Sequence, residues 1–170
     1  MKSTFNISAI AVALAFTISA CGGNTQTVET SGETSITETP VSSAATETTL
    51  TLEGNDQMQF DKTELRVPAG QTITLTLKHT GTMDKNVMGH NFVLLKPGTD
   101  LVAFGQTAAS AVVEDYVPAS ESANVIAHTK LIGGGESVTI QFTVPEKGTY
   151  DYLCSFPGHY AIMKGKLIAE

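Results

Sequence analysis

The chain has 170 residues, a length that suits one compact domain. Its 17 acidic residues outnumber its 10 lysines and arginines, so the formal net charge is −7 at pH 7. No basic cluster interrupts this acidic balance, and we therefore expect neither nucleic-acid binding nor a membrane-binding patch of lysines and arginines.

Residues 1–20 predict an export signal. Lys2 lies near the start, an apolar run extends from Ala9 to Ile18, and small residues follow it, which is the order of a secretory signal peptide. The run is shorter than the roughly 20 residues that a membrane-spanning helix needs. We therefore expect this segment to be removed, which leaves the mature chain more acidic because Lys2 is lost and no acidic residue is.

Cys21 follows this segment directly, and Ala20-Cys21-Gly22 with the residues before it resembles the lipobox of bacterial lipoproteins. The resemblance implies that Cys21 becomes the N-terminal residue and carries lipid, with more than one acyl chain for stable anchoring. It also implies an exported protein anchored to the bacterial outer membrane and facing the periplasm or the cell surface. An ordinary signal followed by a chance cysteine is the alternative.

Residues 21–47 predict a flexible tether that carries the lipid on its first residue. Glycine, serine, threonine and glutamate dominate this segment, and no lysine or arginine offsets its acidic residues. Such a composition cannot bury enough apolar surface to offset the entropy that ordering would cost. A coil of this length spans about 25–30 Å on average, and it would separate the membrane from the domain predicted at residues 48–170.

From residue 48 onward, apolar and polar residues alternate with the two-residue period of half-buried strands. The clearest alternation covers residues 72–77 and 138–144, where threonine or glutamine separates the apolar side chains. Further strands are predicted around Leu50 and Leu52 and at residues 56–60, 64–67, 87–95, 123–128, 150–154 and 165–169.

Residues 99–116 break the alternation, are rich in alanine and valine, and stop shortly before Pro118. This pattern predicts a helical flap of one to four turns. The domain is therefore predicted to be all-β, an eight-stranded Greek-key β-sandwich with one short helical flap.

Cys154, His159 and Met163 follow the spacing C-x4-H-x3-M near the end of the chain, and His90 lies far upstream. A thiolate and two imidazoles with a weakly bound thioether form the ligand set of blue-copper electron-transfer sites. Gly89, just before His90, lets a backbone carbonyl approach the metal from the side opposite Met163. We therefore predict one copper ion in an electron carrier that is not an enzyme.

Three alternatives use the same residues differently. Zinc also accepts cysteine and histidine, although a structural zinc site prefers four strong donors. Cys154 could be a nucleophile with His159 as its base, but Met163 stands where such an enzyme needs a polar group. A copper-buffering protein would need several methionine or histidine clusters, and this chain has one site. A visible thiolate-to-copper band that disappears on reduction belongs to the electron carrier alone.

Four separated motifs resemble those of the azurin family of blue copper proteins, which have the cupredoxin fold. They are Gly54–Phe60 (GNDQMQF), Lys85–Asn91 (KNVMGHN), Val125–Gly133 (VIAHTKLIG) and the loop Cys154–Met163. The similarity runs in order and nearly colinearly from about residue 48 to residue 169. With the lipobox and the tether, the chain as a whole resembles a lipid-modified azurin.

The resemblance implies a role for each matching residue at the copper site. The ligands would be equatorial His90, Cys154 and His159, and axial Met163 and the Gly89 carbonyl. Asn91 would form hydrogen bonds near the thiolate loop and stiffen the site, with Ser155 and Phe156 beside it.

The same resemblance implies a docking surface for redox proteins around the exposed edge of His159. Its members would be Met58, Met83, Met88, Phe156, Pro157 and Ala161. Methionine suits a surface that accepts several partners briefly, and a cytochrome c, a peroxidase or a copper nitrite reductase would suit the family. His79 would modulate the redox behaviour, whereas His128 is expected to be exposed and unligated; an ordinary histidine is the alternative for each.

Two features depart from the azurin pattern. Azurins carry a disulfide near the N-terminal end of the barrel, and the matching positions here hold no cysteine. In the chain-entropy model this absence forfeits about 3 kcal/mol of stability. Phe92 stands where the family has a buried tryptophan, and neither departure touches a predicted ligand.

Overall fold

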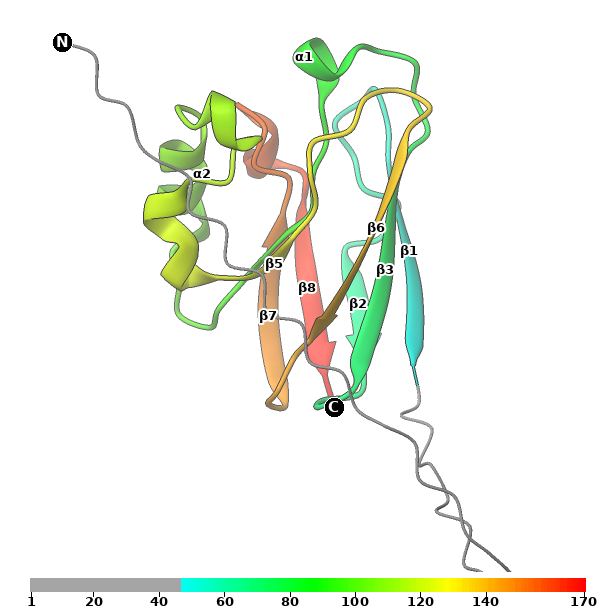
Figure 1. The fold of residues 1–170 in the computed structure, drawn as a ribbon, viewed down its shortest axis with the longest axis vertical. Helices are drawn as coiled ribbons and strands as arrows, with labels where there is room; N and C mark the ends of the chain where they lie inside the picture. The colour runs from blue at the N-terminus through cyan, green and yellow to red at the C-terminus, as the bar shows by residue number, and fades with distance from the viewer. Residues whose placement is uncertain (1–46) are drawn as a thin grey trace, which may run out of the picture. The chain divides into compact units, whose positions relative to one another are not determined.

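The computed structural model describes residues 47–170 (Figure 1). The predicted signal peptide, Cys21 and nearly all of the predicted tether lie outside the described residues. Within residues 47–170, no helix is both long enough and apolar enough to cross a membrane.

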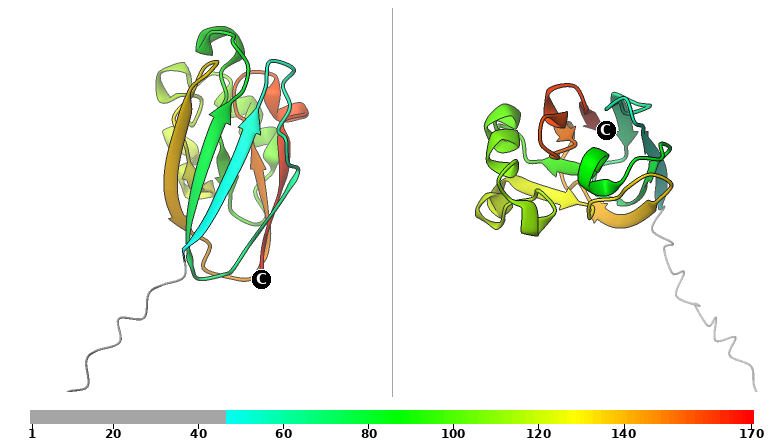
Figure 2. Two further views of the ribbon diagram at one scale, coloured as in Figure 1. Left: turned by 90° about the vertical axis from the view of Figure 1, so that its right-hand side faces the viewer. Right: turned by 90° about the horizontal axis from the view of Figure 1, so that it is seen from above.

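Eight strands form two facing sheets, which Figures 1 and 2 show from three sides. The three-stranded sheet has the order β1-β3-β6, with β1 at Thr48–Gly54, β3 at Thr72–His79 and β6 at Ser137–Thr143. The five-stranded sheet has the order β2-β8-β7-β4-β5, with β2 at Glu64–Val67, β8 at Lys164–Ala169, β7 at Gly148–Leu153, β4 at Val93–Leu95 and β5 at Val125–His128. The predicted all-β sandwich of eight strands is confirmed.

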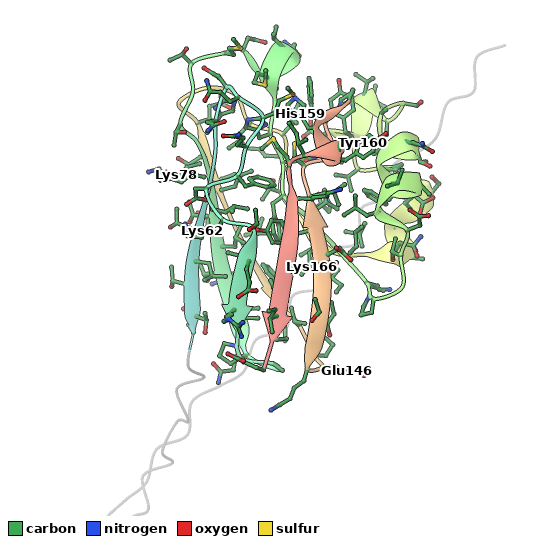
Figure 3. The ribbon with its side chains drawn as sticks, turned by 180° about the vertical axis from the view of Figure 1, so that it is seen from behind. Lys62, Lys78, Glu146, His159, Tyr160 and Lys166 are labelled. Atoms are coloured by element: carbon green, nitrogen blue, oxygen red, sulfur yellow. The ribbon has the colours of Figure 1, made fainter. Side chains whose placement is uncertain are left out.

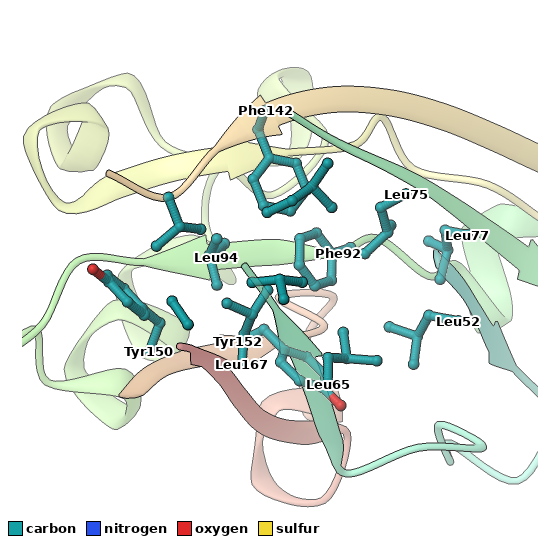
Figure 4. Packing of buried hydrophobic residues seen from close by; sticks show 14 of the residues in the cluster. Leu52, Leu65, Leu75, Leu77, Phe92, Leu94, Phe142, Tyr150, Tyr152 and Leu167 are labelled. Carbon is teal, nitrogen blue, oxygen red and sulfur yellow. The ribbon is translucent and has the colours of Figure 1, made fainter. Parts of the chain in front are cut away.

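Side-chain alternation explains how the two sheets enclose one core (Figure 4). In β3, Ile73, Leu75 and Leu77 are completely buried, whereas the threonines between them are half-buried on the outer face. β1 pairs with β3 in parallel, because the chain crosses to the other sheet to form β2 between them. Each such buried aliphatic side chain contributes about 1.5–3 kcal/mol relative to an exposed one.

Aromatic rings fill the middle of this core. Phe92 lies 5.4 Å from Tyr152 and 6.1 Å from Phe142, measured between ring centroids. Burial raises the pKa of Tyr152 above its ordinary range, and its hydroxyl donates a hydrogen bond of 2.6 Å to the Lys62 carbonyl. Phe92 therefore occupies the expected buried position.

The predicted flap is present as α2 (Leu101–Ala108), followed by the 3-10 helices η1 (Val112–Glu114) and η2 (Ala119–Asn124). Asp100 caps α2, because its carboxylate accepts hydrogen bonds from the first free N–H groups of the helix. Phe104 and Ala108 pack against β4 and β7 in a second apolar cluster. The flap thus covers the outer side of the five-stranded sheet.

Two predicted strands are wrong in whole or in part. Residues 56–60 form a turn, because the Asn55 side chain accepts hydrogen bonds from the N–H groups of Gln57 and Gln59; only Phe60 makes a bridge, to Gly54. The strand predicted at 87–95 is reduced to β4. Side-chain acceptors that capture backbone N–H groups compete with strand pairing in this way.

The missing first half of the 87–95 strand is replaced by a one-turn helix, α1, at Lys85–Met88. Asp84 starts this helix, and its carboxylate accepts a hydrogen bond of 2.8 Å from the Asn86 N–H. Both corrected segments lie in loops at the same end of the sandwich as α1, opposite the C-terminus (Figure 1).

Candidate metal centre

His90, Cys154 and His159 converge although 64 residues separate the first two. One donor atom from each lies within 4.8 Å of the others, and all three residues are buried. The Cys154 sulfur is 3.9 Å from His90 Nδ1 and 3.6 Å from His159 Nδ1. In Figure 3, His159 lies at the end of the sandwich opposite Glu146. Cys154 is a free thiol.

The loop that carries two of these donors is closed by its own backbone. Cys154 directly follows β7, and its N–H donates a hydrogen bond of 2.9 Å to the Met163 carbonyl. The Met163 N–H in turn donates to the His159 carbonyl at 2.8 Å. His159 opens the short 3-10 helix η3 (His159–Ala161), which follows a left-handed turn at Gly158. The segment from Cys154 to Met163 therefore forms a compact loop that backbone hydrogen bonds close.

His90 is held by partners outside that loop. Its backbone pairs with Ile132 in an isolated bridge, and its Nε2 lies 2.9 Å from the Asn55 carbonyl. A carbonyl only accepts hydrogen bonds, so Nε2 carries the proton and Nδ1 keeps a free lone pair toward the sulfur. The end of β1 allows this approach: a Cβ on Gly54 would lie 2.7 Å from the His90 ring.

The two predicted axial groups, the Gly89 carbonyl and Met163, belong to the surroundings of Cys154. The Gly89 carbonyl is 3.8 Å from Cys154 Sγ. Met163 is completely buried and belongs to the apolar cluster that contains Cys154, Leu131 and Phe156. The Cys154 thiol thus has His90, His159 and the Gly89 carbonyl as neighbours, and it shares a buried apolar cluster with Met163.

Burial controls the protonation of the three strong donors. It raises the pKa of the Cys154 thiol to about 12. It lowers the pKa of His159 to about 4, with further lowering from the nearby His90 and His79 rings, and it also lowers the pKa of His90. At neutral pH both imidazoles are therefore neutral and ready to bind a metal, while the thiol needs a cation to become a thiolate.

This donor set fits copper. A buried thiolate with two neutral imidazoles suits a copper ion that changes between two oxidation states, and the thioether is a poor ligand for zinc. The high pKa of the thiol argues against the alternative in which Cys154 is a nucleophile, because the reactive form is the thiolate.

Asn91 and Ser155 connect the segment that carries His90 to the segment that carries Cys154. The Asn91 Oδ1 accepts a hydrogen bond of 2.8 Å from the Ser155 N–H, and its Nδ2 donates to the Asp115 carbonyl at 2.9 Å. The Ser155 hydroxyl donates to the Tyr116 carbonyl at 2.6 Å. Asp115 and Tyr116 both have positive φ angles, of 50° and 62°, and this strained pair ties the flap to the metal-binding loop.

Phe156 and His79 pack against the two histidine ligands from different sides. The Phe156 ring lies 4.7 Å from the His159 ring. His79 ends β3 and stacks on His90, with ring centroids 4.3 Å apart and planes 14° apart. His128 is exposed on β5, as predicted, and does not belong to the cluster of donors.

The predicted docking residues differ in exposure. Met83 is 43% exposed, Met58 and Met88 are half-buried, Pro157 and Ala161 are exposed, and Phe156 is buried. Val87 and Ile162, which were not among the predicted docking residues, are 64% and 57% exposed. Val87 lies inside the motif KNVMGHN and Ile162 lies directly before Met163, so their positions in the sequence could have indicated them.

The likeness to known proteins covers the whole described domain. The family model of copper binding proteins, plastocyanin/azurin family, matches residues 46–170. Azurin-1 of Alcaligenes xylosoxydans xylosoxydans is 46% identical over 125 residues, which cover 71% of this chain and 96% of that protein. Outer membrane protein H.8 of Neisseria gonorrhoeae is 45% identical over 120 residues, which cover 69% of this chain and 64% of that protein.

Auracyanin-A of Chloroflexus aurantiacus is similar over its entire length. It is 37% identical in an alignment of 176 positions that covers 100% of both chains. Its solved structure, described as that of a "blue" copper protein, has a TM-score of 0.67 and 38% identity, and the match covers 74% of this chain and 100% of that one.

Proposed function

The chain belongs to the plastocyanin/azurin family of copper-binding proteins, and from that premise we propose that it carries single electrons on one copper ion bound by His90, Cys154 and His159. The convergence of one buried thiol and two neutral imidazoles within 4.8 Å is the observation that carries the proposal. Copper bound there would supply the one-electron chemistry of Cu(II) and Cu(I).

The residues around the donors would limit movement during electron transfer. The Asn55 carbonyl orients His90, and the backbone bonds between Cys154, Met163 and His159 hold the loop. Met163 and the Gly89 carbonyl would provide the weak axial contacts, and Asn91 would keep the two ligand segments in register. A site held in this way needs little rearrangement between the two oxidation states.

Copper titration of the purified metal-free protein tests this function. We expect saturation at one copper per chain, with an intense visible band from thiolate-to-copper charge transfer that disappears on reduction. Zinc loading is the matched control, because it would fill the same donors without colour. A colourless copper-loaded protein would contradict the proposal.

For the docking surface, the proposed members are Met58, Met83, Met88, Phe156, Pro157 and Ala161, around the edge of His159. Its apolar character supports brief contact with redox proteins, of the cytochrome c, peroxidase or copper nitrite reductase type. Met88→Asp should slow electron transfer to such a partner and leave the visible spectrum unchanged. Thr149→Asp adds the same charge near the start of β7, at the end of the strand remote from Cys154, and serves as the control. Equal rates for the two variants would remove the surface from the proposal.

For the rest of the chain, the proposed organisation is a lipoprotein signal at residues 1–20, lipid on Cys21, a tether at residues 21–47 and the copper domain at residues 48–170. The lipobox resemblance supports it, as does the similarity to a protein named outer membrane protein H.8. Cys21→Ala should release the protein from the membrane fraction, whereas Ser19→Ala should not. Retention of the Cys21 variant would refute the lipid anchor.

A further inference from the structure

Asp56 stands out because its carboxylate is turned inward beneath the loop that follows β3. Its Oδ2 accepts a hydrogen bond of 2.8 Å from the Thr82 N–H, and its Oδ1 accepts one of 3.3 Å from the Met83 N–H. The side chain is only 16% exposed. A Cβ on Gly81 would clash with Oδ1, so the loop packs directly on the carboxylate.

The bonds that hold Asp56 also keep it ionised. The hydrogen bond from the Thr82 N–H, above all, holds the pKa of Asp56 below its ordinary value. No lysine or arginine of residues 47–170 lies within 4 Å of this carboxylate. Asp56 is therefore a fixed negative charge without a cationic side-chain partner in the described domain.

This charge lies behind one of the proposed ligands. Asp56 Oδ1 is 4.0 Å from His79 Nε2, and the His79 ring stacks on the His90 ring. Both nitrogens of His79 have backbone partners: Nε2 lies 2.8 Å from the Met88 carbonyl, and Nδ1 accepts a hydrogen bond of 3.1 Å from the Gly81 N–H. These two partners match a neutral ring with its proton on Nε2, so His79 carries no positive charge that would offset the negative charge of Asp56.

We propose that Asp56 is a tuning residue of the copper centre, whose fixed charge behind the His79–His90 stack lowers the reduction potential. The inference rests on the proposed function and adds a residue to it. A negative charge stabilises the more positive Cu(II) state relative to Cu(I), and it acts more strongly from a partly buried position than from the surface. Asp56 has this effect without contacting the metal.

Asp56→Asn tests the proposal, because it removes the charge and keeps the size and an acceptor oxygen. We expect the midpoint potential to rise while the visible spectrum and the copper content stay the same. Asp84→Asn is the matched control: it removes an exposed carboxylate in the adjoining loop, and asparagine caps α1 equally well. The midpoint potential of Asp84→Asn should shift much less than that of Asp56→Asn. Equal shifts in both variants, or a fall with Asp56→Asn, would overturn the proposal.

The effect of salt distinguishes the partly buried charge of Asp56 from charges on the surface. The difference between the wild-type protein and Asp56→Asn should persist from low salt to about 1 M, where the screening length is only about 3 Å. Should Asp56→Asn fail to hold copper, Asp56→Ser removes the charge and keeps a hydroxyl acceptor, and we expect the same rise of the midpoint potential.

The outcomes also distinguish this inference from the proposed function. A wild-type protein that stays colourless with copper refutes the electron carrier itself. If the wild-type protein is blue but neither Asp56→Asn nor Asp56→Ser changes its midpoint potential, the role of Asp56 is refuted and the electron carrier is not.

Discussion

The body of the sandwich and its metal-binding end are built by different means. In the body, apolar residues at every second position place whole strands, as Leu75 and Leu77 do in β3. At the metal-binding end, single polar side chains direct the backbone, as Asn55 and Asp84 do by accepting N–H groups. A periodic pattern therefore determines the architecture, and isolated hydrogen bonds determine where the ligands lie.

The two regions also differ in how their stability is distributed. Many side chains share the core, so the loss of one weakens the domain without changing its shape. The metal site depends on a few atoms at fixed distances, so one change there alters function and leaves most of the fold intact. Four variants or conditions test this contrast.

Cys154→Ser should have the largest effect, which is complete loss of the visible copper band. The hydroxyl that replaces the thiol is a poor copper ligand, while the neighbouring core stays in place. Absorption spectroscopy and circular dichroism measure the two consequences, with the copper-free wild-type protein as the reference for folding. Retention of the colour would refute the ligand assignment.

Leu75→Ala should lower the free energy of unfolding by about 2–5 kcal/mol and leave the colour of the folded protein unchanged. Leu75 is completely buried between the sheets. Denaturant unfolding measures the loss, and Thr51→Ala on the exposed face of β1 should change stability by less than about 0.5 kcal/mol. A strong spectral change in Leu75→Ala would show that core and site are not separable.

Asn91→Ala should weaken copper binding about 10- to 100-fold. The variant loses the hydrogen bonds that join the segment after His90 to Ser155. Competition with a chelator measures the affinity, and Asn86→Ala, on exposed α1, is the control. An affinity equal to that of the wild-type protein would mean that the loop holds its geometry without this link.

Copper uptake should release about one proton per chain near neutral pH. The Cys154 thiol, with its pKa raised to about 12, is protonated before copper binds, whereas His90 and His159 have lowered pKa values and are already neutral. Affinity should therefore rise about tenfold for each unit of pH between about 7 and 9. An indicator dye counts the protons, and release of two or three would contradict the neutral imidazoles.

The same contrast explains what could be predicted from the sequence. Strand β2 was predicted with its observed bounds, and β3 within two residues, because each has clear two-residue alternation. Met58 and Phe60 alternate with glutamines in the same way, yet they form a turn because one asparagine side chain captures the intervening N–H groups. Periodicity alone does not distinguish these cases.

The residues that would bind the metal were easier to predict from the sequence than the residues that hold them in place. Cys154 and His159 could be recognised from residue type and local spacing, and His90 from its motif. Asp56 and the strained pair Asp115–Tyr116 could not, because their partners lie 16 to 39 residues away along the chain. Such contacts exist only once the two sheets have brought the loops together.

The direction of β1 places the start of the described domain and the metal site at opposite ends of the strand. The strand begins at Thr48 and ends at Gly54, beside His90, and seven extended residues span roughly 20 Å. An electrode or a bead attached ahead of Thr48 would hold the domain by the pole remote from its copper. The opposite pole would remain open to a dissolved mediator, so a domain immobilised through the residues ahead of Thr48 can still exchange electrons in solution.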